Sequence, residues 1–405
     1  MANKFSLVSL GCPKNLVDSD NLTERLVNSG LSYLDNPENT DILLINTCGF
    51  IQDAKKESIA EILKLAEIKK RTHVSVTVNS DSVGKKLTLK PDTDTNLPSQ
   101  THEHHPKLIV FGCLAKRYKN DLIKEIPDID AIFGVGEEEK IVEYCEKIQV
   151  PSVSVSVNSV SVGKKLTLKT DTDTNLTPSP IHPFSSYAYL KIAEGCSRKC
   201  TYCVIPSIRG EYKSITPDEI LKKAEGYINA GIKELILIAQ DTASYGKGLK
   251  GYDIAALLKG LCSIKGDFWI RLLYAYPASI KDPLLKVIAG EEKICKYLDI
   301  PFQHSEDRIL KLMKRGGSRK GYLNLIRKIR HTIPDIALRT TFIAGFPSET
   351  EEEFNSLIKF IEEAEFDRLG AFKYSKEEGT PAAKLKEHLT EAIKNRRFDT
   401  IMRHQ

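Results

Sequence analysis

The sequence lacks a hydrophobic run of the roughly 18 residues that a membrane-spanning helix requires. It also lacks the long apolar segment of a secretory signal, because the run that begins at Phe5 has only the length of a strand. Its charge is nearly balanced, with 59 basic and 54 acidic side chains in 405 residues, so composition gives no argument for a nucleic-acid partner. We therefore expect a soluble cytoplasmic protein of two or three domains, with no membrane partner and no direct nucleic-acid partner.

Disulfides are not expected, since thiols stay reduced in the cytoplasm. The chain nevertheless has nine cysteines, and six of them fall into two sets of three. The other three follow no pattern, and free cysteine is among the most buried residue types. We expect these three to be buried core thiols: Cys145, Cys262 and Cys295.

An internal repeat interrupts the chain. Residues 74–97 recur at residues 153–176 with three differences, which is typical of a duplicated insert and not of a solenoid built from many stacked units. Both copies are rich in Ser, Thr, Asp, Asn and Lys, so they predict solvated loops or hairpins without a catalytic role. The histidines around the first copy are assigned to the same solvated loop, although adventitious metal binding is the alternative: His73, His102, His104 and His105.

Strand-like and helix-like segments alternate within residues 1–149, outside an insert at about 73–106. The expected strands are 5–10, 41–46, 107–111 and 131–134, and the expected helices are 18–29 and 55–69. This alternation predicts the parallel sheet of a Rossmann-like α/β domain.

One set of three cysteines follows the strands of this first domain. Cys12, Cys48 and Cys113 each come just after an apolar run. Because the carboxyl ends of parallel strands share one edge of a sheet, these cysteines are expected to converge on a common ligand. The alternative is three unrelated buried thiols.

A second α/β series follows the inserted linker at residues 150–183. The expected strands are 187–193, 234–239, 269–274, 296–300, 337–343 and 368–374, and helical runs separate them at 217–230, 253–261, 318–331 and 349–363. Six such units predict a partial (β/α)6 barrel over residues 184–405, with its active site at the carboxyl ends of the strands.

The second set of cysteines follows the first strand of the predicted barrel. Cys196, Cys200 and Cys203 lie in a loop short enough to wrap one face of an iron-sulfur cube. Fully ligated electron carriers use four cysteines, so three leave one iron open for an exchangeable ligand, for which S-adenosylmethionine (SAM) is the natural candidate. Zinc is the alternative, although zinc motifs usually pair two C-x2-C elements or combine Cys with His.

The spacing C-x3-C-x2-C resembles the cluster motif of radical SAM enzymes. The longer run AEGCSRKCTYCVIPSIRG, residues 193–210, resembles the methylthiotransferase branch of that family. This resemblance implies two 4Fe-4S clusters, the radical SAM cluster on Cys196, Cys200 and Cys203, and an auxiliary cluster that holds the sulfur to be inserted. The auxiliary cluster would be bound by Cys12, Cys48 and Cys113.

Further segments resemble the branch that modifies a ribosomal protein more than the branch that modifies tRNA. They include SLGCPKNLVDSD (9–20), INTCGFIQDAKKESI (45–59), YLDIPFQH (297–304) and FDRLGAFKYSKEEGTPA (366–382). The resemblance implies that the β carbon of an aspartate in the small-subunit ribosomal protein uS12 is methylthiolated. It implies one SAM molecule as the methyl source and a second as the source of the radical that takes the β hydrogen. A flavodoxin or a ferredoxin is the expected reductant.

Three residues are candidates for SAM contacts. Tyr202 lies inside the cysteine loop, where an aromatic ring can pack on adenine, and Gln240 and Arg339 lie at or in later strands. For Gln240 and Arg339 the alternative is an ordinary hydrogen-bonded polar group at a strand end.

The resembled family usually continues beyond the barrel into a small β domain, called TRAM, that helps to engage the substrate. This sequence ends at Gln405, soon after a helical stretch at 387–402, and we expect the TRAM domain to be absent. The alternatives to a ribosomal-protein enzyme are therefore a tRNA methylthiotransferase and a truncated, inactive iron-sulfur or zinc protein.

Overall fold

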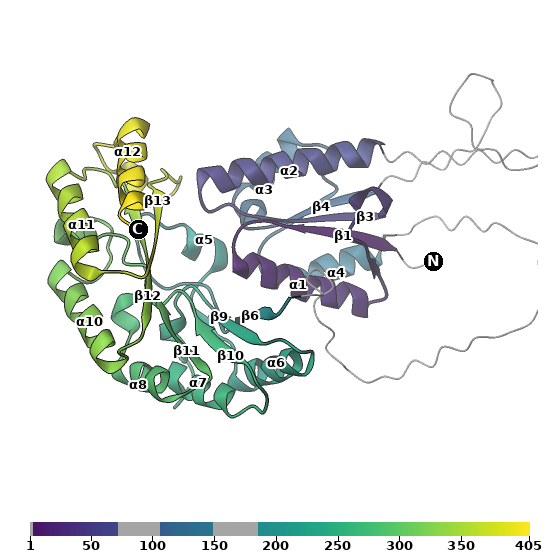
Figure 1. Ribbon diagram of the computed structural model, residues 1–405. Coiled ribbons are helices and arrows are strands. Elements are labelled where there is room, and N and C mark those ends of the chain that lie inside the picture. Colours follow the sequence, from purple (N-terminus) through teal and green to yellow (C-terminus); the bar gives the residue numbers. More distant parts are fainter. Residues whose placement is uncertain (1–2, 72–105, 149–184) are drawn as a thin grey trace, which may run out of the picture.

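The computed structural model describes residues 3–71, 106–148 and 185–405, which form two α/β units that lie side by side (Figure 1). The first unit contains residues 3–71 and 106–148, and the second contains residues 185–405. Both copies of the repeat and the four histidines near the first copy lie outside the described residues. No helix in the described part of the chain is long and apolar enough to cross a membrane.

The first unit is built on a five-stranded parallel sheet in the order β2-β1-β3-β4-β5. Its strands are β1 (Lys4–Ser9), β2 (Ser32–Tyr33), β3 (Ile42–Thr47), β4 (Lys107–Gly112) and β5 (Ala131–Phe133). All six residues of the central strand β3 are buried, and its first four residues form the apolar run ILLI that is typical of a strand with both faces covered.

Helices cover both faces of this sheet. They are α1 (Pro13–Asn28), α2 (Gln52–Arg71), α3 (Cys113–Glu125) and α4 (Glu138–Glu146). Apolar side chains of α2 and α3 pack on one face, and those of α1 and α4 pack on the other. The first unit is therefore doubly wound, as predicted from the alternation of strands and helices.

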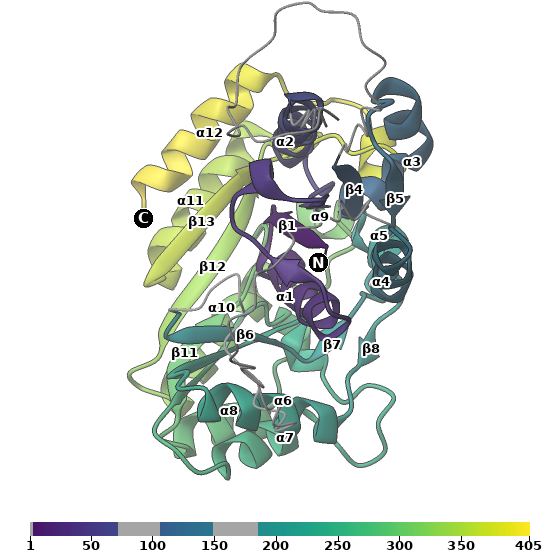
Figure 2. The ribbon, with the colours of Figure 1, turned by 90° about the vertical axis from the view of Figure 1, so that its right-hand side faces the viewer.

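The second unit is a curved sheet of six parallel strands in the order β6-β9-β10-β11-β12-β13. Its strands are β6 (Tyr187–Lys191), β9 (Glu234–Ile238), β10 (Trp269–Leu272), β11 (Ile294–Asp299), β12 (Ala337–Ala344) and β13 (Arg368–Lys373). The main helices outside it are α6 (Pro217–Asn229), α7 (Ile254–Cys262), α8 (Asp282–Gly290), α10 (Arg319–Thr332), α11 (Glu351–Ala364) and α12 (Glu391–Arg403). The first and last strands do not pair with each other, so the predicted partial barrel is confirmed (Figure 2).

Shorter elements lie at the face of the barrel that meets the first unit. They are the antiparallel pair β7 (Ala193–Glu194) and β8 (Lys213–Ser214), and the short helices α5 (Ile205–Arg209) and α9 (Asp307–Leu312). The expected first barrel strand at 187–193 is therefore too long, because Ala193 pairs with Ser214 and leaves the main sheet.

Helix α1 begins at Pro13, five residues earlier than expected, since proline is well suited to the first turn of a helix. Helices α3 and α4 were not predicted. Helix α3 begins at Cys113 directly after Gly112, whose φ of 99° makes the sharp turn out of β4. A Cβ at Gly112 would lie 2.2 Å from the side-chain oxygen of Asn46, so only glycine fits there.

Candidate active site

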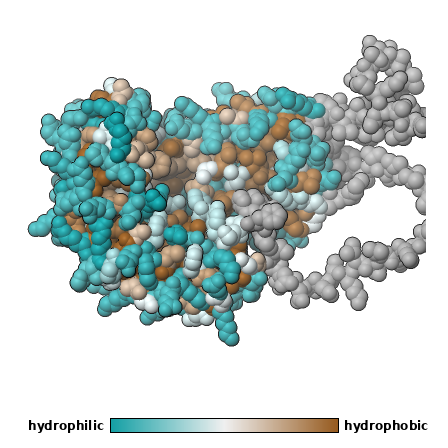
Figure 3. All heavy atoms as spheres, in the orientation of Figure 1, coloured by the Kyte–Doolittle hydropathy of each residue, from teal (hydrophilic) through white to brown (hydrophobic). Residues whose placement is uncertain are grey.

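The two units enclose a cavity of about 510 Å³ that is lined by all six cysteines of the two predicted sets. The cavity lies where the carboxyl ends of both sheets face each other, and Figure 3 shows hydrophobic side chains gathered between the units. Phe50, Ile51, Ala54 and Phe372 contribute apolar surface to its wall. Parallel α/β sheets bind ligands at this edge, so the cavity is the candidate active site.

Cys12, Cys48 and Cys113 lie together around the start of α1. The thiols of Cys12 and Cys113 lie 3.9 and 3.7 Å from the same acceptor, the side-chain oxygen of Asn15. Gly11 brings the third cysteine close, because a Cβ on it would lie 2.9 Å from the sulfur of Cys48. Three cysteines from three strand ends therefore share one edge of the cavity.

Cys196, Cys200 and Cys203 lie opposite, in the loop between β7 and α5. The backbone N–H of Arg198 donates to the sulfur of Cys196 at 3.4 Å, and the N–H of Cys203 donates to the carbonyl of Cys200 at 3.2 Å. A contact outside the cavity fixes this loop, because the hydroxyl of Thr201 donates to the carbonyl of Leu312, in α9, at 2.8 Å.

The thiol environments fit iron-sulfur clusters. Burial raises the pKa of both Cys113 and Cys203 to about 12, because a thiolate loses its hydration there. Arg209 beside Cys113 and Arg315 beside Cys203 act in the opposite direction and favour the thiolate. A metal ion deprotonates a coordinating thiol outright, so the guanidinium groups and N–H donors suit the thiolates of a bound cluster.

Within residues 3–71, 106–148 and 185–405, no three His, Cys, Asp or Glu side chains converge closely enough to hold a single metal ion. A 4Fe-4S cube binds each thiolate on a different iron, so its ligands need not converge on one point.

The remaining cysteines lie away from the cavity, and all nine are free thiols. Cys145 is buried in the core of the first unit, as predicted. The same prediction is wrong for Cys262 and Cys295, which are only partly buried. Cys262 is the last residue of α7, and Cys295 lies in the partly buried middle of β11.

Of the three SAM candidates, the structure brings Tyr202 and Gln240 to the cavity. The hydroxyl of Tyr202 accepts a hydrogen bond from Arg315 at 3.2 Å. The side-chain oxygen of Gln240 is buried and has no hydrogen-bond partner among the described residues, so it is an acceptor that a ligand can use. Arg339 is not among the residues that line the cavity, and its guanidinium pairs with Asp299 at 3.1 Å.

Sequence reasoning missed the cationic and aromatic groups of the cavity. The ring of Tyr276 lies between two guanidinium groups, 3.8 Å from that of Arg198 and 4.5 Å from that of Arg315. Arg198 is fixed by Asp241 at 2.9 Å. Burial lowers the pKa of Lys14, and the charges of Cys12, Glu194 and Asp299 raise it in part. For Lys14 the sequence contained a signal, because a lysine in the first turn of a helix interacts unfavourably with the helix dipole.

A buried ion cluster joins the two units beside the cavity. Arg209 of α5 binds Asp18 of α1 at 3.0 Å and Glu194 of β7 at 2.9 Å, and Lys191 binds both carboxylates. Burial alone would raise the pKa of Glu194, but the charges of Lys191 and Arg209 lower it to about 2. The helix that follows Cys12 and the helix that follows Cys203 are therefore held together.

A second ion cluster joins the units at α2. Glu377, in the loop after β13, accepts from Lys55 and Arg117 at 2.9 Å each, and its side chain is 3% exposed. Arg117 also donates to the carbonyl of Gly49, in the loop that contains Cys48. We call the two ion clusters clasps, the first around Arg209 and the second around Glu377, because each holds the two units together beside the cavity.

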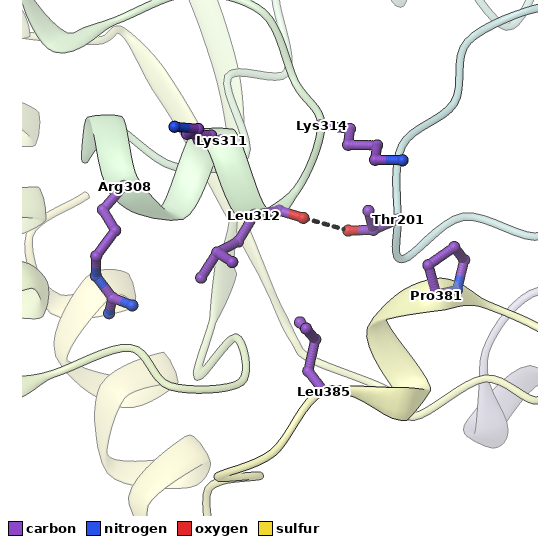
Figure 4. A pocket seen from close by; sticks show the side chains of 7 residues that line it. All are labelled: Thr201, Arg308, Lys311, Leu312, Lys314, Pro381 and Leu385. Atoms are coloured by element: carbon purple, nitrogen blue, oxygen red, sulfur yellow. Dashed lines mark hydrogen bonds between the residues drawn. The ribbon is translucent and has the colours of Figure 1, made fainter.

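A smaller pocket of about 410 Å³ opens behind the cysteine loop of the barrel (Figure 4). Its floor includes Thr201, whose hydroxyl bonds to the carbonyl of Leu312. Three cations line it, and Arg308 is already paired with Glu353 at 2.7 Å. Lys311 and Lys314 have no ion-pair partner in the part of the chain that the structure describes, so the pocket has an unbalanced positive charge.

Comparison with known families identifies both units. A sequence model of the radical SAM superfamily matches residues 190–361, and one of the uncharacterized protein family UPF0004 matches residues 4–80. The ribosomal protein uS12 methylthiotransferase RimO of Thermodesulfovibrio yellowstonii is 50% identical over 99% of this chain and 82% of the relative. RimO of Clostridioides difficile is 42% identical over 98% of this chain and 81% of the relative.

Solved structures share the fold. The radical S-adenosylmethionine methyltransferase TsrM of Kitasatospora setae, bound to tryptophan and a SAM analogue, matches with a TM-score of 0.57 and 13% identity, over 91% of this chain and 73% of TsrM. The cobalamin-dependent radical enzyme OxsB, with aqua-cobalamin bound, matches with a TM-score of 0.58 and 14% identity, over 98% of this chain and 56% of OxsB. At these identities the likeness shows the arrangement of the elements and nothing about substrate.

Proposed function

Since the chain belongs to the RimO family of ribosomal protein uS12 methylthiotransferases and is a radical SAM transferase, we propose that it inserts a methylthio group at the β carbon of an aspartate in uS12. The observation that carries the proposal is that all six cysteines line one cavity. The reaction removes a hydrogen and delivers sulfur at the same carbon, so the two centres must face the same space.

Two 4Fe-4S clusters are proposed, one held by Cys196, Cys200 and Cys203, and one held by Cys12, Cys48 and Cys113. When bound, the first supplies the electron that cleaves SAM, and the second supplies the sulfur. The domain division follows from this assignment. Residues 1–149 hold the auxiliary cluster and residues 184–405 form the radical SAM barrel, with residues 150–183 as the linker.

The residues of the chain bind and orient SAM. Tyr202 and Gln240 line the cavity beside the cysteine loop, and we assign them to SAM contacts. The hydrogen bond from Arg315 fixes the ring of Tyr202, and the buried oxygen of Gln240 can accept from the amino group of a ligand. Arg339 was predicted for the same role but pairs with Asp299 outside the cavity lining, so its assignment has no support from this geometry.

The pocket behind the cysteine loop is the proposed docking place of the reductant, a flavodoxin or a ferredoxin. Thr201 lies between Cys200 and Cys203 and forms part of the pocket floor, so a donor seated there is separated from the cluster by one loop. Lys311 and Lys314 supply unpaired positive charge. An acidic electron-transfer protein would be complementary to this charge.

The test uses protein reconstituted anaerobically with iron and sulfide, SAM, a reductant and a uS12 peptide with deuterium at the β carbon of its aspartate. We expect a methylthiolated peptide and deuterium in the 5'-deoxyadenosine that is released. The β carbon carries two hydrogens and the reaction replaces one, so a methylthiolated peptide that retains both β deuterium atoms would overturn the β-carbon assignment. Methylthiolation of a tRNA substrate in the same reaction, with none of the peptide, would assign the chain to tRNA modification.

A further inference from the structure

The cavity contains four cations but is lined by no Asp or Glu among the described residues. Three of the cations are satisfied by the protein. Arg198 pairs with Asp241, Arg209 pairs with Asp18, and Arg315 donates to the carbonyls of Pro301 and Phe302. The fourth cation, Lys14, has no hydrogen-bond or ion-pair partner in the described parts of the chain.

Lys14 lies at the boundary between the two units. It is the second residue of α1 and follows Cys12 by two positions, so it belongs to the edge that bears the first set of cysteines. Its ammonium lies 4.0 Å from the centroid of the Tyr274 ring, and Tyr274 follows β10 of the barrel. The ammonium therefore lies where the first unit meets the barrel, in the cavity that both sets of cysteines line.

The backbone of Tyr274, whose ring contacts the Lys14 ammonium, has an unfavourable conformation. Tyr274 has a φ of 61°, a left-handed conformation that is unfavourable for a residue other than glycine. The protein fixes it through the backbone, because the N–H of Tyr274 donates to Asp299 at 3.2 Å and its carbonyl accepts from Thr242 at 3.2 Å. The ring face attracts the ammonium without neutralising it, which leaves the N–H donors of Lys14 free for an anion.

We propose that Lys14 binds the side-chain carboxylate of the substrate and so restricts the reaction to a carbon adjacent to a carboxylate. This inference rests on the proposed function, in which the reacting carbon is the β carbon of an aspartate. The carboxylate is one bond from that carbon, so its capture by Lys14 holds the carbon in the cavity that both sets of cysteines line. An ammonium and a carboxylate form a strong charge-assisted hydrogen bond.

Two carboxylates can enter this cavity, that of the substrate and that of SAM. We assign Lys14 to the substrate because it belongs to the edge of Cys12, whereas the SAM candidates Tyr202 and Gln240 belong to the barrel. The neutral amide of asparagine has nearly the same shape as aspartate but lacks the charge. A site that pairs a charged group rejects such an analogue because its own charge is then left unpaired.

The test measures binding of two uS12 peptides, one with aspartate and one with asparagine at the modified position, and separately of SAM. The proteins are wild type, Lys14→Met, Lys14→Arg and Lys56→Met, the last an exposed lysine outside the cavity. We expect the wild type and Lys56→Met to prefer the aspartate peptide by at least about tenfold, Lys14→Met to lose this preference, and Lys14→Arg to retain part of it. SAM affinity, iron content and circular dichroism are expected to be unchanged.

An unchanged preference in Lys14→Met would overturn the proposal, as would a loss of SAM affinity with peptide binding intact. The mass of the peptide product distinguishes a failure of the proposed function from a failure of the proposed role of Lys14. A wild type that methylthiolates its peptide but binds both peptides equally would retain the proposed function and contradict the role of Lys14. A wild type that prefers the aspartate peptide but never modifies it would retain the role of Lys14 and contradict the proposed function.

Discussion

The guanidinium of Arg209 binds the carboxylate of Asp18 at 3.0 Å across the boundary between the two units. Both side chains are almost fully buried, with exposures of 1% and 7%. Arg209 also donates to the side-chain oxygen of Asn15 at 2.7 Å, which is the acceptor for the thiols of Cys12 and Cys113. One guanidinium therefore links the loop of the barrel cysteines to the cysteines of the first sheet.

Loss of Asp18 is expected to destabilise the protein. Among the described residues, the substitution Asp18→Asn leaves Arg209 and Lys191 with Glu194 as their one remaining carboxylate partner, and breaking a buried ion pair costs about 3–5 kcal/mol. The thermal midpoint of unfolding is expected to fall by several degrees. The exposed pair of Arg25 and Glu139 provides the control, because Glu139→Gln should change stability by less than about 1 kcal/mol. Equal midpoints for Asp18→Asn and Glu139→Gln would contradict the role of the ion cluster.

The second clasp is expected to control local opening at α2. The substitution Glu377→Gln leaves Lys55 and Arg117 without their buried counter-ion, so the contact between α2 and the loop after β13 should loosen. Hydrogen exchange should become faster at residues 50–55 and 375–380 and stay unchanged in β12, which lies in the barrel core. Uniform acceleration over the whole chain would indicate global destabilisation and not a local clasp.

Each cysteine set is expected to hold half of the iron. Replacement of Cys196, Cys200 and Cys203 by alanine should remove about half of the bound iron and abolish SAM cleavage. Replacement of Cys12, Cys48 and Cys113 should remove the other half and leave SAM cleavage in place. Cys262→Ala, outside the cavity, is the control and should change neither. Full iron content in either triple variant would contradict the assignment of that set.

If the reductant docks at Lys311 and Lys314, reversing their charge should lower turnover with a protein donor but not with a small chemical donor. The double variant Lys311→Glu and Lys314→Glu should lower turnover with flavodoxin by about tenfold at low salt, because like charges then repel an acidic donor. Turnover with dithionite should be unchanged. The matched control is Lys222→Glu and Lys286→Glu on outer helices α6 and α8, which should behave as wild type with both donors. A loss that is equal with dithionite would exclude a docking effect.

A buried carboxyl group predicts a pH effect on stability. Burial raises the pKa of Glu349 to about 7, although Arg397 and two backbone N–H groups lower it in part. The folded state therefore binds more protons than the unfolded chain between pH 4.5 and 7, so this stability is complete below 4.5 and is lost as pH rises through 7. Glu349→Gln cannot ionise, and its stability relative to wild type should rise by about 3 kcal/mol from pH 4.5 to 8. Urea unfolding at several pH values measures this difference, and a constant difference would contradict the shift.

Burial also lowers the pKa of the neighbouring His304 to about 3. The contribution of His304 has the opposite sign, and its Nε2 lies 4.0 Å from the carboxylate of Glu349, so the comparison of wild type with Glu349→Gln reports on both groups below pH 6.5 and on Glu349 alone above it.

The fold could be predicted because buried parallel strands are continuous apolar runs. The run ILLINT predicts β3, and Cys48, which follows it, must therefore lie at the carboxyl edge of the sheet. The same reasoning located all six cavity cysteines. It failed for α3 and α4, whose polar sequences leave a narrow apolar stripe, and for the start of α1, where Pro13 was not taken as a helix signal.

The contacts between the two units could not be predicted. Arg209 and Asp18 are 191 residues apart, and no local pattern reports how two separately packed units meet. Lys14 and Tyr274 meet across the same boundary. Arg339 shows a second limit of sequence reasoning. Its place in a barrel strand predicted that it lies near the cavity, but sequence does not give the direction of a long side chain. The guanidinium of Arg339 turns to Asp299.

Methylthiolation of uS12 by this chain is best tested by the intact mass of uS12 from a bacterial strain that lacks its own methylthiotransferase and expresses this chain. We expect a mass gain equal to the replacement of one hydrogen by a methylthio group, and no gain with the triple alanine variant of Cys196, Cys200 and Cys203. An unmodified mass in cells that contain soluble, iron-loaded protein would contradict it.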